Sequence, residues 1–262
     1  MNRSVPHQNT FDIAKKLKAW QTFILIVSTT FTIISILLNS FDKSKATFDI
    51  DKTINWINAS SSFFAIAFIV FDILINSKFY TGGKEKRLDL IDHAFGTNYS
   101  GEKSTGYFNA DGVETGVYKL AVHGFENSLF TSEVARNMTF NKWAAALIIA
   151  TIFIFSACIG NKDLVNNILQ IAATGVLIQQ AVRLQQFSDR MKNIHGEFKA
   201  LFNDLKNMTD KTSKEGEMLR NVLSYETTIS WGSILTDTKV FNKLNATLSS
   251  KWDVMKRDYN IH

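Results

Sequence analysis

The sequence predicts a mainly α-helical integral membrane protein with four transmembrane helices in two hairpins, because its charged residues are unevenly spaced. Asp, Glu, Lys and Arg are absent from four windows, residues 19–41, 53–71, 143–161 and 164–182. Each window holds 19 to 23 residues. A helix that rises about 1.5 Å per residue needs about that length to cross the roughly 30 Å hydrocarbon core of a bilayer. The average composition hides this pattern, since only 45% of the 262 residues are hydrophobic.

The four windows differ in strength. The first two contain long aliphatic and aromatic runs, and the third is apolar apart from Thr151, Ser156 and Cys158. Asn and Gln side chains interrupt the fourth window, but only Lys162 and Asp163 separate it from the third. This short separation predicts a tight hairpin that returns the chain to its starting side. A buried pair of soluble helices is the alternative for the last two windows.

The distribution of basic residues predicts the orientation, because loops rich in Lys and Arg resist translocation. The outer side has four basic residues, Lys43, Lys45, Lys52 and Lys162. Near the helix ends, the other side has twelve: Lys15, Lys16, Lys18, Lys78, Lys84, Lys86, Arg87, Arg136, Lys142, Arg183, Arg190 and Lys192. We therefore expect both termini in the cytoplasm.

The windows divide the chain into five parts. We expect a cytoplasmic N-terminus (1–18), a first transmembrane hairpin (19–76), a cytoplasmic insert (77–142), a second transmembrane hairpin (143–182) and a cytoplasmic helical tail (183–262). The insert and the tail are each small for an independent core, so we expect them to form one mostly helical domain. Within the insert, Gly82 and Gly83 are expected to break the second span, with a short helix over residues 84–95 and Gly96 just past its end.

The tail opens with a heptad pattern that continues the fourth window without a helix breaker. Its apolar positions are Leu184, Phe187, Met191, Ile194, Phe198, Leu201, Leu205 and Met208. The pattern predicts one long helix whose seam joins subunits in an oligomer, or packs on the chain's own helices. A last amphipathic helix is expected to start at Asp237 or Thr238, which are capping residues.

Signals of enzymatic chemistry are weak. The five histidines show no metal-ligand spacing, and the chain has no phosphate-binding glycine loop of the Walker type and no Gly-x-Ser-x-Gly motif. Cys158 is the only cysteine, so no disulfide framework exists. The net charge of +5 is too diffuse to indicate binding of a DNA or RNA polymer. We therefore expect no enzyme, no metal and no cofactor.

Polar residues inside the spans have two interpretations. Asp163, Asn167, Gln170 and Thr174 share one helical face, and they either line a water-permeable path in an oligomer or form hydrogen bonds between helices. Four hydroxyl residues of the first window, Ser28, Thr29, Thr32 and Ser35, are arranged similarly. Asp72 lies near the cytoplasmic end of the second span, where a carboxylate reaches the headgroups by snorkelling or acts as a buried switch.

The insert combines basic and aromatic residues of the types that hold an anionic, stackable ligand such as a cyclic nucleotide. The candidates are Lys84, Lys86, Arg87, Tyr99, Lys103, Tyr107, Tyr118 and Lys119. The positive-inside rule is an alternative explanation for the basic residues among them.

Three segments, residues 87–95, 126–131 and 225–233, together with the two hairpins, the insert and the helical tail, carry a resemblance that covers nearly the whole chain. The chain resembles the four-transmembrane effectors of bacterial conflict systems that are encoded beside cyclic-oligonucleotide synthases and described as pore-forming. The resemblance implies defence against phage by abortive infection. It assigns no ligand-binding residue to this chain.

On that basis we expect a homo-oligomeric effector in the lipid bilayer of the bacterial inner membrane. A cyclic oligonucleotide or another infection signal is expected to trigger its assembly, after which it permeabilises the membrane. The alternatives are a constitutive channel or transporter, and a membrane scaffold that recruits a partner through its coiled-coil-like tail.

Overall fold

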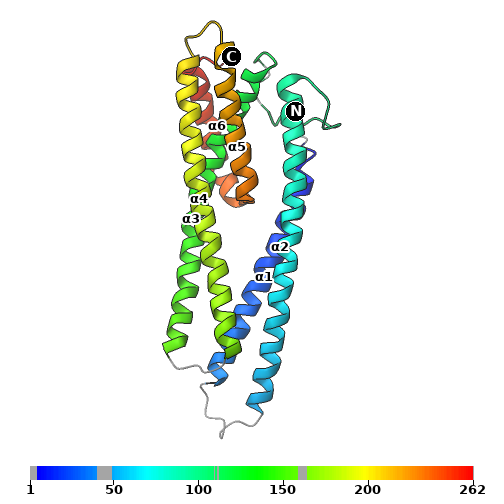
Figure 1. Ribbon diagram of the computed structural model, residues 1–262, viewed down its shortest axis with the longest axis vertical. Helices are drawn as coiled ribbons and strands as arrows, with labels where there is room; N and C mark the ends of the chain where they lie inside the picture. The colour runs from blue at the N-terminus through cyan, green and yellow to red at the C-terminus, as the bar shows by residue number, and fades with distance from the viewer. Residues whose placement is uncertain (1–4, 40–48, 109, 111, 159–163, 262) are drawn as a thin grey trace. The chain divides into compact units, whose positions relative to one another are not determined.

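The chain folds almost entirely into helices (Figure 1). The computed structural model describes residues 5–39, 49–108, 110, 112–158 and 164–261, apart from the side chains of 156–174. The helices are α1 (Gln8–Asn39), α2 (Ile50–Phe95), α3 (Val117–Cys158), α4 (Leu164–Leu205), the short 3-10 helix η2 (Thr212–Lys214), α5 (Glu215–Gly232) and α6 (Thr238–Asp258). No strand occurs among these residues, so the predicted helical class is confirmed.

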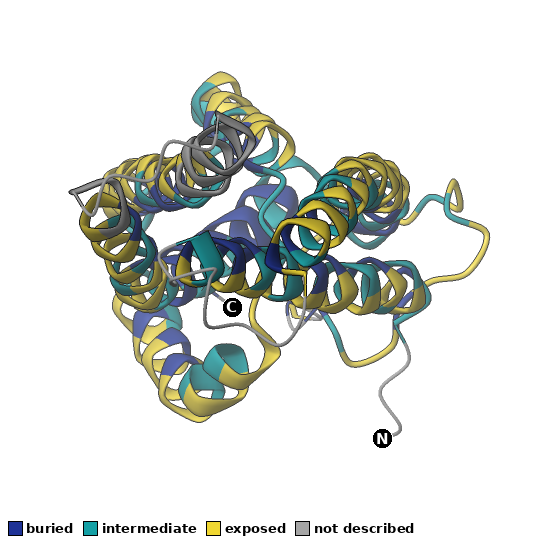
Figure 2. Ribbon diagram, turned by 90° about the horizontal axis from the view of Figure 1, so that it is seen from below, coloured by how far each residue is buried: buried dark blue, intermediate teal, exposed yellow. Residues whose placement is uncertain are grey.

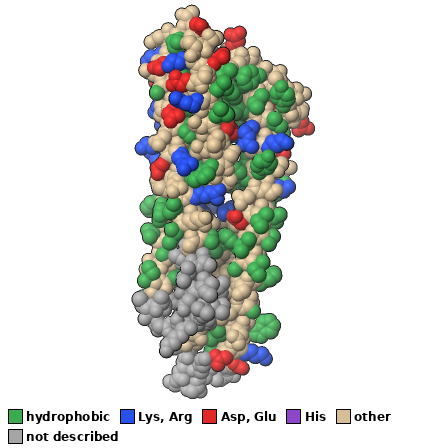
Figure 3. Space-filling view, viewed as in Figure 1, with side chains coloured by type: hydrophobic (Ala, Val, Ile, Leu, Met, Phe, Trp, Pro, Cys, Tyr) green, Lys and Arg blue, Asp and Glu red, His purple; other side chains and the backbone are tan. Residues whose placement is uncertain are grey.

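Three helices of the described chain are long and apolar enough to cross a membrane: α1, α2, and α3 through Phe155. Their apolar side chains face outward, and Phe23, Ile66 and Phe155 are each more than half exposed. Figure 3 shows apolar side chains gathered along these helices, with few charged groups between them. So large an apolar surface is unusual for a soluble monomer and is typical of helices that face lipid. The structure does not add the fourth predicted span to these three.

The chain divides into two compact units. The core unit consists of Met1–Asp12, Lys78–Phe140 and Arg183–His262, and the apolar unit consists of Ile13–Ser77 and Asn141–Val182. The predicted insert and tail therefore belong to one unit, together with the first residues of the chain. Helices α1, α2, α3 and α4 each contribute residues to both units.

The core unit is built around the ring of Phe125, a residue of α3 with no exposed surface. This ring stacks on Phe198 and Phe202 of α4 with ring centroids 5.9 and 4.8 Å apart, and Trp252 of α6 meets it edge-on at 5.4 Å. Helix α5 adds the buried side chains of Met218, Val222 and Tyr225 to the same cluster. In Figure 2 buried and exposed residues alternate along several helices, as an amphipathic pattern predicts.

The heptad seam lies inside this core. Its first seven members, from Leu184 to Leu205, are at most 6% exposed, and Met208 packs against them. The seam therefore packs on the chain's own α3, α5 and α6, which is the second of the two predicted arrangements. These side chains are not free to join a second copy, and the oligomerisation seam inferred from the sequence is corrected accordingly. The single long helix is confirmed, since α4 runs unbroken from Leu164 to Leu205.

The end of α5 packs so closely on α4 that only glycine fits at position 232. A Cβ atom at Gly232 would overlap the ring of Phe187, whereas a Cβ atom at Gly216 of the same helix would meet no atom within 4 Å. We expect G232A to lower the free energy of unfolding by about 1–3 kcal/mol through overpacking. We expect G216A to raise it by about 0.5–1 kcal/mol, because alanine is the better helix former.

Thermal unfolding of the two alanine variants in detergent checks this prediction. Opposite shifts of the unfolding midpoint support the packing of α5 on α4. Equal shifts for the two substitutions would contradict it.

Helix α2 continues through Gly82 and Gly83, so the predicted break at these glycines is wrong. Both glycines are buried, and the ring of Phe11 lies 3.2 Å from where a Cβ atom of Gly82 would be. Phe11 also packs edge-on against Phe79, at 5.8 Å between ring centroids. The glycines thus serve the close approach of α1 to α2 rather than a break. The helix ends as predicted at Gly96, whose φ of 72° is costly for other residues.

A loop, described over residues 96–108, 110 and 112–116, follows α2, and its first residues are held by the buried carboxylate of Asp92. This group accepts hydrogen bonds from Thr97 Oγ1, Tyr99 N and the backbone and side chain of Ser100, at 2.6–2.7 Å. Burial alone would raise the pKa of Asp92, but these donors outweigh burial and lower it. The fixed loop then carries Tyr107 back toward α2.

Within the apolar unit, polar side chains join α1 to α2. Gln21 Nε2 donates to Asp72 Oδ1 at 3.1 Å, and Ser35 Oγ donates to Asn58 Oδ1 at 3.0 Å. Gln21 and Ser35 are at most 1% exposed. Hydrogen bonding between helices, the alternative for the polar face of the first span, therefore describes Ser35. Asp72 is exposed, and Gln21 and Asn76 both donate to it.

Candidate functional site

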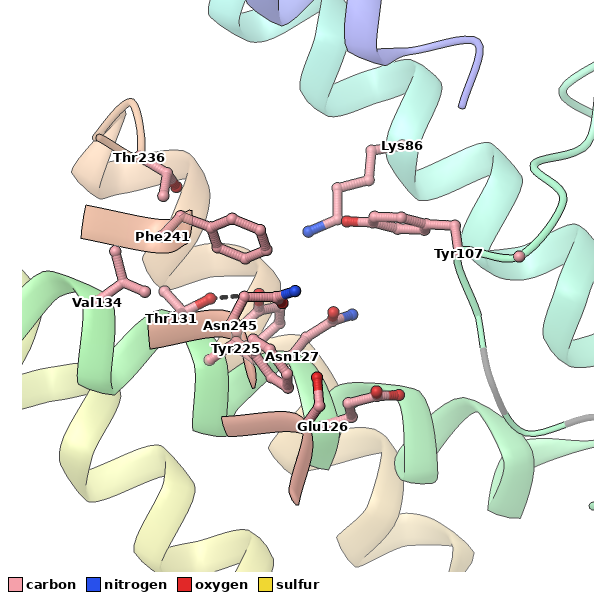
Figure 4. Close-up of a pocket in the computed structure, with 13 residues that line it drawn as sticks. Lys86, Tyr107, Glu126, Asn127, Thr131, Val134, Tyr225, Thr236, Phe241 and Asn245 are labelled. Carbon is pink, nitrogen blue, oxygen red and sulfur yellow. Dashed lines mark hydrogen bonds between the residues drawn. The ribbon is translucent and has the colours of Figure 1, made fainter. Parts of the chain in front are cut away.

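The core unit contains a cavity of about 300 Å³ (Figure 4). Its lining comes from α2, the loop of residues 96–116, α3, α5, α6 and the segment before α6. The lining residues are Lys86, Gly106, Tyr107, Glu126, Asn127, Phe130, Thr131, Val134, Tyr225, Thr236, Phe241, Asn245 and Ser249. The volume lies at the small end of the range for small-molecule sites, and aromatic rings with a few convergent polar groups are the usual lining of such sites.

One side of the cavity is cationic. In Figure 4 the Lys86 side chain of α2 extends toward the hydroxyl of Tyr107. Its Nζ atom lies 5.9 Å from the ring centroid of Tyr225. Burial disfavours the ammonium form, but Tyr225, Tyr107 and Glu226 outweigh burial and raise the pKa of Lys86 above its ordinary value. Lys86 is therefore charged at neutral pH and is suited to bind an anion.

Tyr225 of α5 forms part of the cavity wall and is only 1% exposed. Its hydroxyl lies 3.1 Å from Thr131 Oγ1 of α3, which fixes the ring between the two helices (Figure 4). Burial raises the pKa of the Tyr225 phenol, so the group stays protonated at neutral pH. The buried ring lies beside the Lys86 ammonium, and Phe130 and Phe241, which are partly exposed, add two further rings to the lining.

A second side of the cavity carries a carboxyl group and carboxamides. Glu126 and Asn127 are consecutive in α3, and Asn245 and Ser249 lie one turn apart in α6. Asn127 Nδ2 is buried and has no hydrogen-bond partner among the described residues. Burial raises the pKa of Glu126 to about 7, with Lys256 lowering it and Asp253 raising it. This side therefore presents a hydrogen-bond donor without a partner beside a carboxyl group that titrates near neutral pH.

The structure brings two of the eight predicted ligand residues, Lys86 and Tyr107, to the cavity. Arg87 instead donates from Nη1 to Ser230 Oγ at 3.1 Å and lies 3.8 Å from Glu226. Lys84, Tyr99 and Lys103 are exposed and lie outside the cavity lining.

The last two predicted ligand residues also lie outside the lining. Tyr118 packs on Phe202 at 5.8 Å between ring centroids, with Lys211 Nζ 3.7 Å above its ring. Lys119 lies in the first turns of α3, where its charge acts on His123. Six of the eight predicted residues thus lie outside this cavity. Helical periodicity turns those of α2 and α3 to other faces, and Tyr99 and Lys103 are exposed in the loop after α2.

Sequence reasoning missed the residues that α3, α5 and α6 contribute, although a signal for some of them was present. Two segments that the sequence analysis singled out, 126–131 and 225–233, supply Glu126, Asn127, Phe130, Thr131 and Tyr225 to the lining. The third such segment, residues 87–95, contributes no residue to it.

The predicted pore-lining residues cannot be placed in the same way. Asp163 lies outside the described residues, and the side chains of Asn167, Gln170 and Thr174 in α4 are also outside the description.

The first turn of α1 attaches to α2 on both sides of Lys86. Thr10 Oγ1 donates to Glu85 Oε2 at 2.9 Å, and His7 Nδ1 lies 3.4 Å from Asp89 Oδ2. The His7 ring also meets the Tyr107 ring edge-on at 5.3 Å between centroids. The segment that enters α1 therefore contacts the lining residue Tyr107 and the neighbours of Lys86 on α2.

Asp89 is the centre of this attachment. It accepts hydrogen bonds from the backbone and the hydroxyl of Ser104, and His93 Nε2 lies 3.6 Å away. Burial would raise the pKa of Asp89, but the bonds from His7 and Ser104 outweigh burial and lower it. The hydroxyl of Ser104 donates to a carboxylate rather than to an imidazole, so this Ser, His and Asp group lacks the geometry of a nucleophilic triad.

Two buried histidines make the core unit sensitive to acid. His123 has no hydrogen-bond partner for either ring nitrogen within the described part of the chain, and burial lowers its pKa to about 3. His195 contacts Ser128 Oγ at 3.0 Å, and burial lowers its pKa to about 4. Each residue takes up a proton near pH 6.5 when unfolded but stays neutral when folded. Their contribution to stability is therefore complete above pH 6.5 and is lost as the pH falls toward 4.

We expect wild type to lose about 2 kcal/mol more than H123L between pH 7 and pH 5, because leucine cannot take up a proton. Glu126 has a raised pKa, so it adds to the free energy of unfolding as the pH falls, equally in both proteins. The difference in pH-dependent stability between wild type and H123L therefore reports His123 alone. Unfolding midpoints in detergent at the two pH values measure this difference. Parallel loss in the two proteins would show that His123 already binds a proton in the folded state.

Comparison with known proteins gives no assignment: no family model, no curated protein and no solved structure matches the chain. Among the described residues, no group of three or more His, Cys, Asp or Glu side chains is placed to hold a metal ion. The function must therefore be argued from the cavity and the apolar helices.

Proposed function

We propose that the chain is a ligand-gated membrane effector of bacterial anti-phage defence. A nucleotide second messenger or another anionic infection signal binds the cavity, and the transmembrane helices then permeabilise the inner membrane. The cavity itself carries this proposal, because it combines a charged lysine, four aromatic rings and two carboxamides in a unit whose helices continue into apolar spans. Two of the three segments that carry the resemblance, 126–131 and 225–233, contribute to its lining, which adds support.

The contacts of the cavity supply a route from ligand to membrane. Lys86 belongs to α2, and Tyr107 contacts His7, the residue before α1. Both helices continue into candidate spans. A ligand that pulls Lys86 and Tyr107 together, or pushes them apart, changes how the start of α1 packs on α2. The ligand shifts the equilibrium between two such arrangements only if it binds one of them more tightly than the other.

The remaining parts of the proposal concern the membrane. In the proposed arrangement α4 supplies a fourth span through residues 164–182, both termini are cytoplasmic, and several copies assemble around the leak. The positive-inside distribution of Lys and Arg supports the orientation. Because the heptad seam is buried in the core, assembly uses the exposed apolar faces of the spans.

Expression in bacteria with and without a co-expressed cyclic-nucleotide synthase tests the function. Membrane potential and growth are followed together. We expect depolarisation and growth arrest only when both proteins are present. Depolarisation without any synthase would favour a constitutive channel. Unchanged potential with a series of synthases that together make each major cyclic dinucleotide and trinucleotide would contradict the proposal.

The scaffold alternative loses its main support in this structure. It requires the heptad seam to be available to a partner, whereas those side chains are buried.

A further inference from the structure

The two sides of the cavity differ in chemistry, and this difference indicates what the ligand must carry. Lys86 offers a positive charge on one side, while Glu126 and Asn127 offer a carboxyl group and a carboxamide from one turn of α3. A simple anion such as phosphate would satisfy Lys86 and leave the other side without partners. The partly exposed aromatic ring of Phe241 adds a flat surface on which a planar ring stacks.

Resting on the proposed function, we propose that Glu126 is a specificity-determining residue that selects a guanine base, while Lys86 binds the phosphate of the same nucleotide. The Watson–Crick edge of guanine presents two neighbouring donors, N1–H and N2–H, which match the two oxygens of a carboxylate. The guanine O6 atom beside them is an acceptor, and it matches the donor of Asn127 Nδ2 that has no partner among the described residues. Adenine lacks the N1–H donor and presents a different pattern.

Glu126 and Asn127 both line the cavity, which favours this pairing. The donor, donor, acceptor order along the guanine edge requires a carboxylate and an amide within reach of one base, and these two residues provide them. The cavity of about 300 Å³ has room for one base with its sugar and phosphate. A cyclic oligonucleotide would thus place a single guanylate unit in it.

The charge of Glu126 makes the selection depend on pH. The charged groups around it are Lys256 and Asp253 of α6, with Lys86 of α2 and the hydroxyls of Tyr107 and Tyr225 across the cavity. With a pKa of about 7, the carboxyl is mostly neutral at pH 6 and mostly ionised at pH 8. Only the ionised form accepts both donors of guanine. Preference for guanine is therefore expected to rise with pH.

The test is calorimetric titration of the full chain in detergent with GMP, IMP, AMP and inorganic phosphate at pH 6 and pH 8. IMP keeps N1–H and lacks N2–H, so the affinities are expected in the order GMP, IMP, AMP. At pH 8 we expect GMP to bind about 10- to 100-fold more tightly than AMP. The three nucleotides carry the same phosphate group, which titrates in the same way in each. The ratio of GMP to AMP affinity therefore reports the contribution of the base alone. At pH 6 the ratio is expected to fall by up to about tenfold.

Two variants complete the experiment. E126Q is expected to bring the ratio of GMP to AMP affinity within about twofold and to remove its pH dependence. E114Q is the matched control, because Glu114 is exposed and lies outside the cavity lining. Equal affinities of wild type for the three nucleotides, or an unchanged ratio in E126Q, would overturn the assignment of Glu126. If E126Q does not fold, the order of the three nucleotides on wild type decides.

The outcomes separate this inference from the proposed function. Guanine selectivity without any membrane leak would leave the inference standing and remove the proposed function. A leak triggered by nucleotides without preference for a base would do the reverse. Absence of binding by all four ligands would overturn the inference.

Discussion

Replacing Lys86 with glutamine is expected to abolish ligand-triggered leakage while the chain stays in the membrane. Lys86 is the cavity's source of positive charge among the lining residues, and it is charged at neutral pH. A hydrogen bond between charged groups contributes about 1.5–3 kcal/mol, so the loss of charge is expected to weaken binding of an anionic ligand by about 10- to 150-fold. The measurement is dye release from proteoliposomes as a function of ligand concentration.

Lys84→Gln is the control for Lys86. Lys84 lies two residues earlier on α2, is exposed, and is absent from the cavity lining. Both substitutions remove one positive charge from the same helix. Equal loss of response in the two variants would indicate a general effect of charge and would remove Lys86 from the site.

The second large effect is expected at the first turn of α1. The contacts of His7 with Asp89 and Tyr107 and the bond from Thr10 to Glu85 stabilise the packing of the N-terminal segment on α2, which the proposed function takes as the resting arrangement. Removing them is expected to destabilise that arrangement by about 1–3 kcal/mol. In the variant H7A combined with T10V, leakage without ligand is therefore expected to rise by about 5- to 100-fold. The ligand concentration for half-maximal release is expected to fall.

The control for this variant is Gln8→Ala, because Gln8 is exposed and lies between the two contacts in the sequence. Leakage is measured for both variants at equal protein density in the liposomes. If the double variant leaks no more than Gln8→Ala and responds at the same ligand concentration, the first turn of α1 does not hold the resting state.

Much of the fold follows from the spacing of charged residues. Long uncharged windows predicted helices that cross a membrane, and three of the helices have the required length and apolarity. Local signals also located helix ends, since Asp237 caps α6 by accepting bonds from Lys239 N and Val240 N. These features depend on neighbouring residues, which is why the sequence alone predicts them.

Features that depend on tertiary contacts were not predictable in this way. Gly82 and Gly83 were expected to end a helix, but Phe11 packs on them and the helix continues. A heptad seam has the same pattern whether it packs on a second copy or on the same chain. In the structure Phe187 and Phe198 are buried against other helices of the same chain, so the seam packs within one chain.

The cavity shows the same limit. Basic and aromatic residues of the insert predicted Lys86 and Tyr107, because their residue types suit an anionic ring. The other sides come from α3, α5 and α6, and Tyr225 and Asn245 are far from the insert in sequence. Their convergence is a result of packing around Phe125, and residue type alone does not indicate it.

Dye release from proteoliposomes that contain only the purified full chain tests the central claim most directly. Liposomes with wild type are compared before and after addition of a guanine-containing cyclic dinucleotide, and empty liposomes report the background. The account predicts release that begins on addition of the ligand and is absent from empty liposomes. Intact liposomes at saturating, calorimetrically verified ligand occupancy would contradict it.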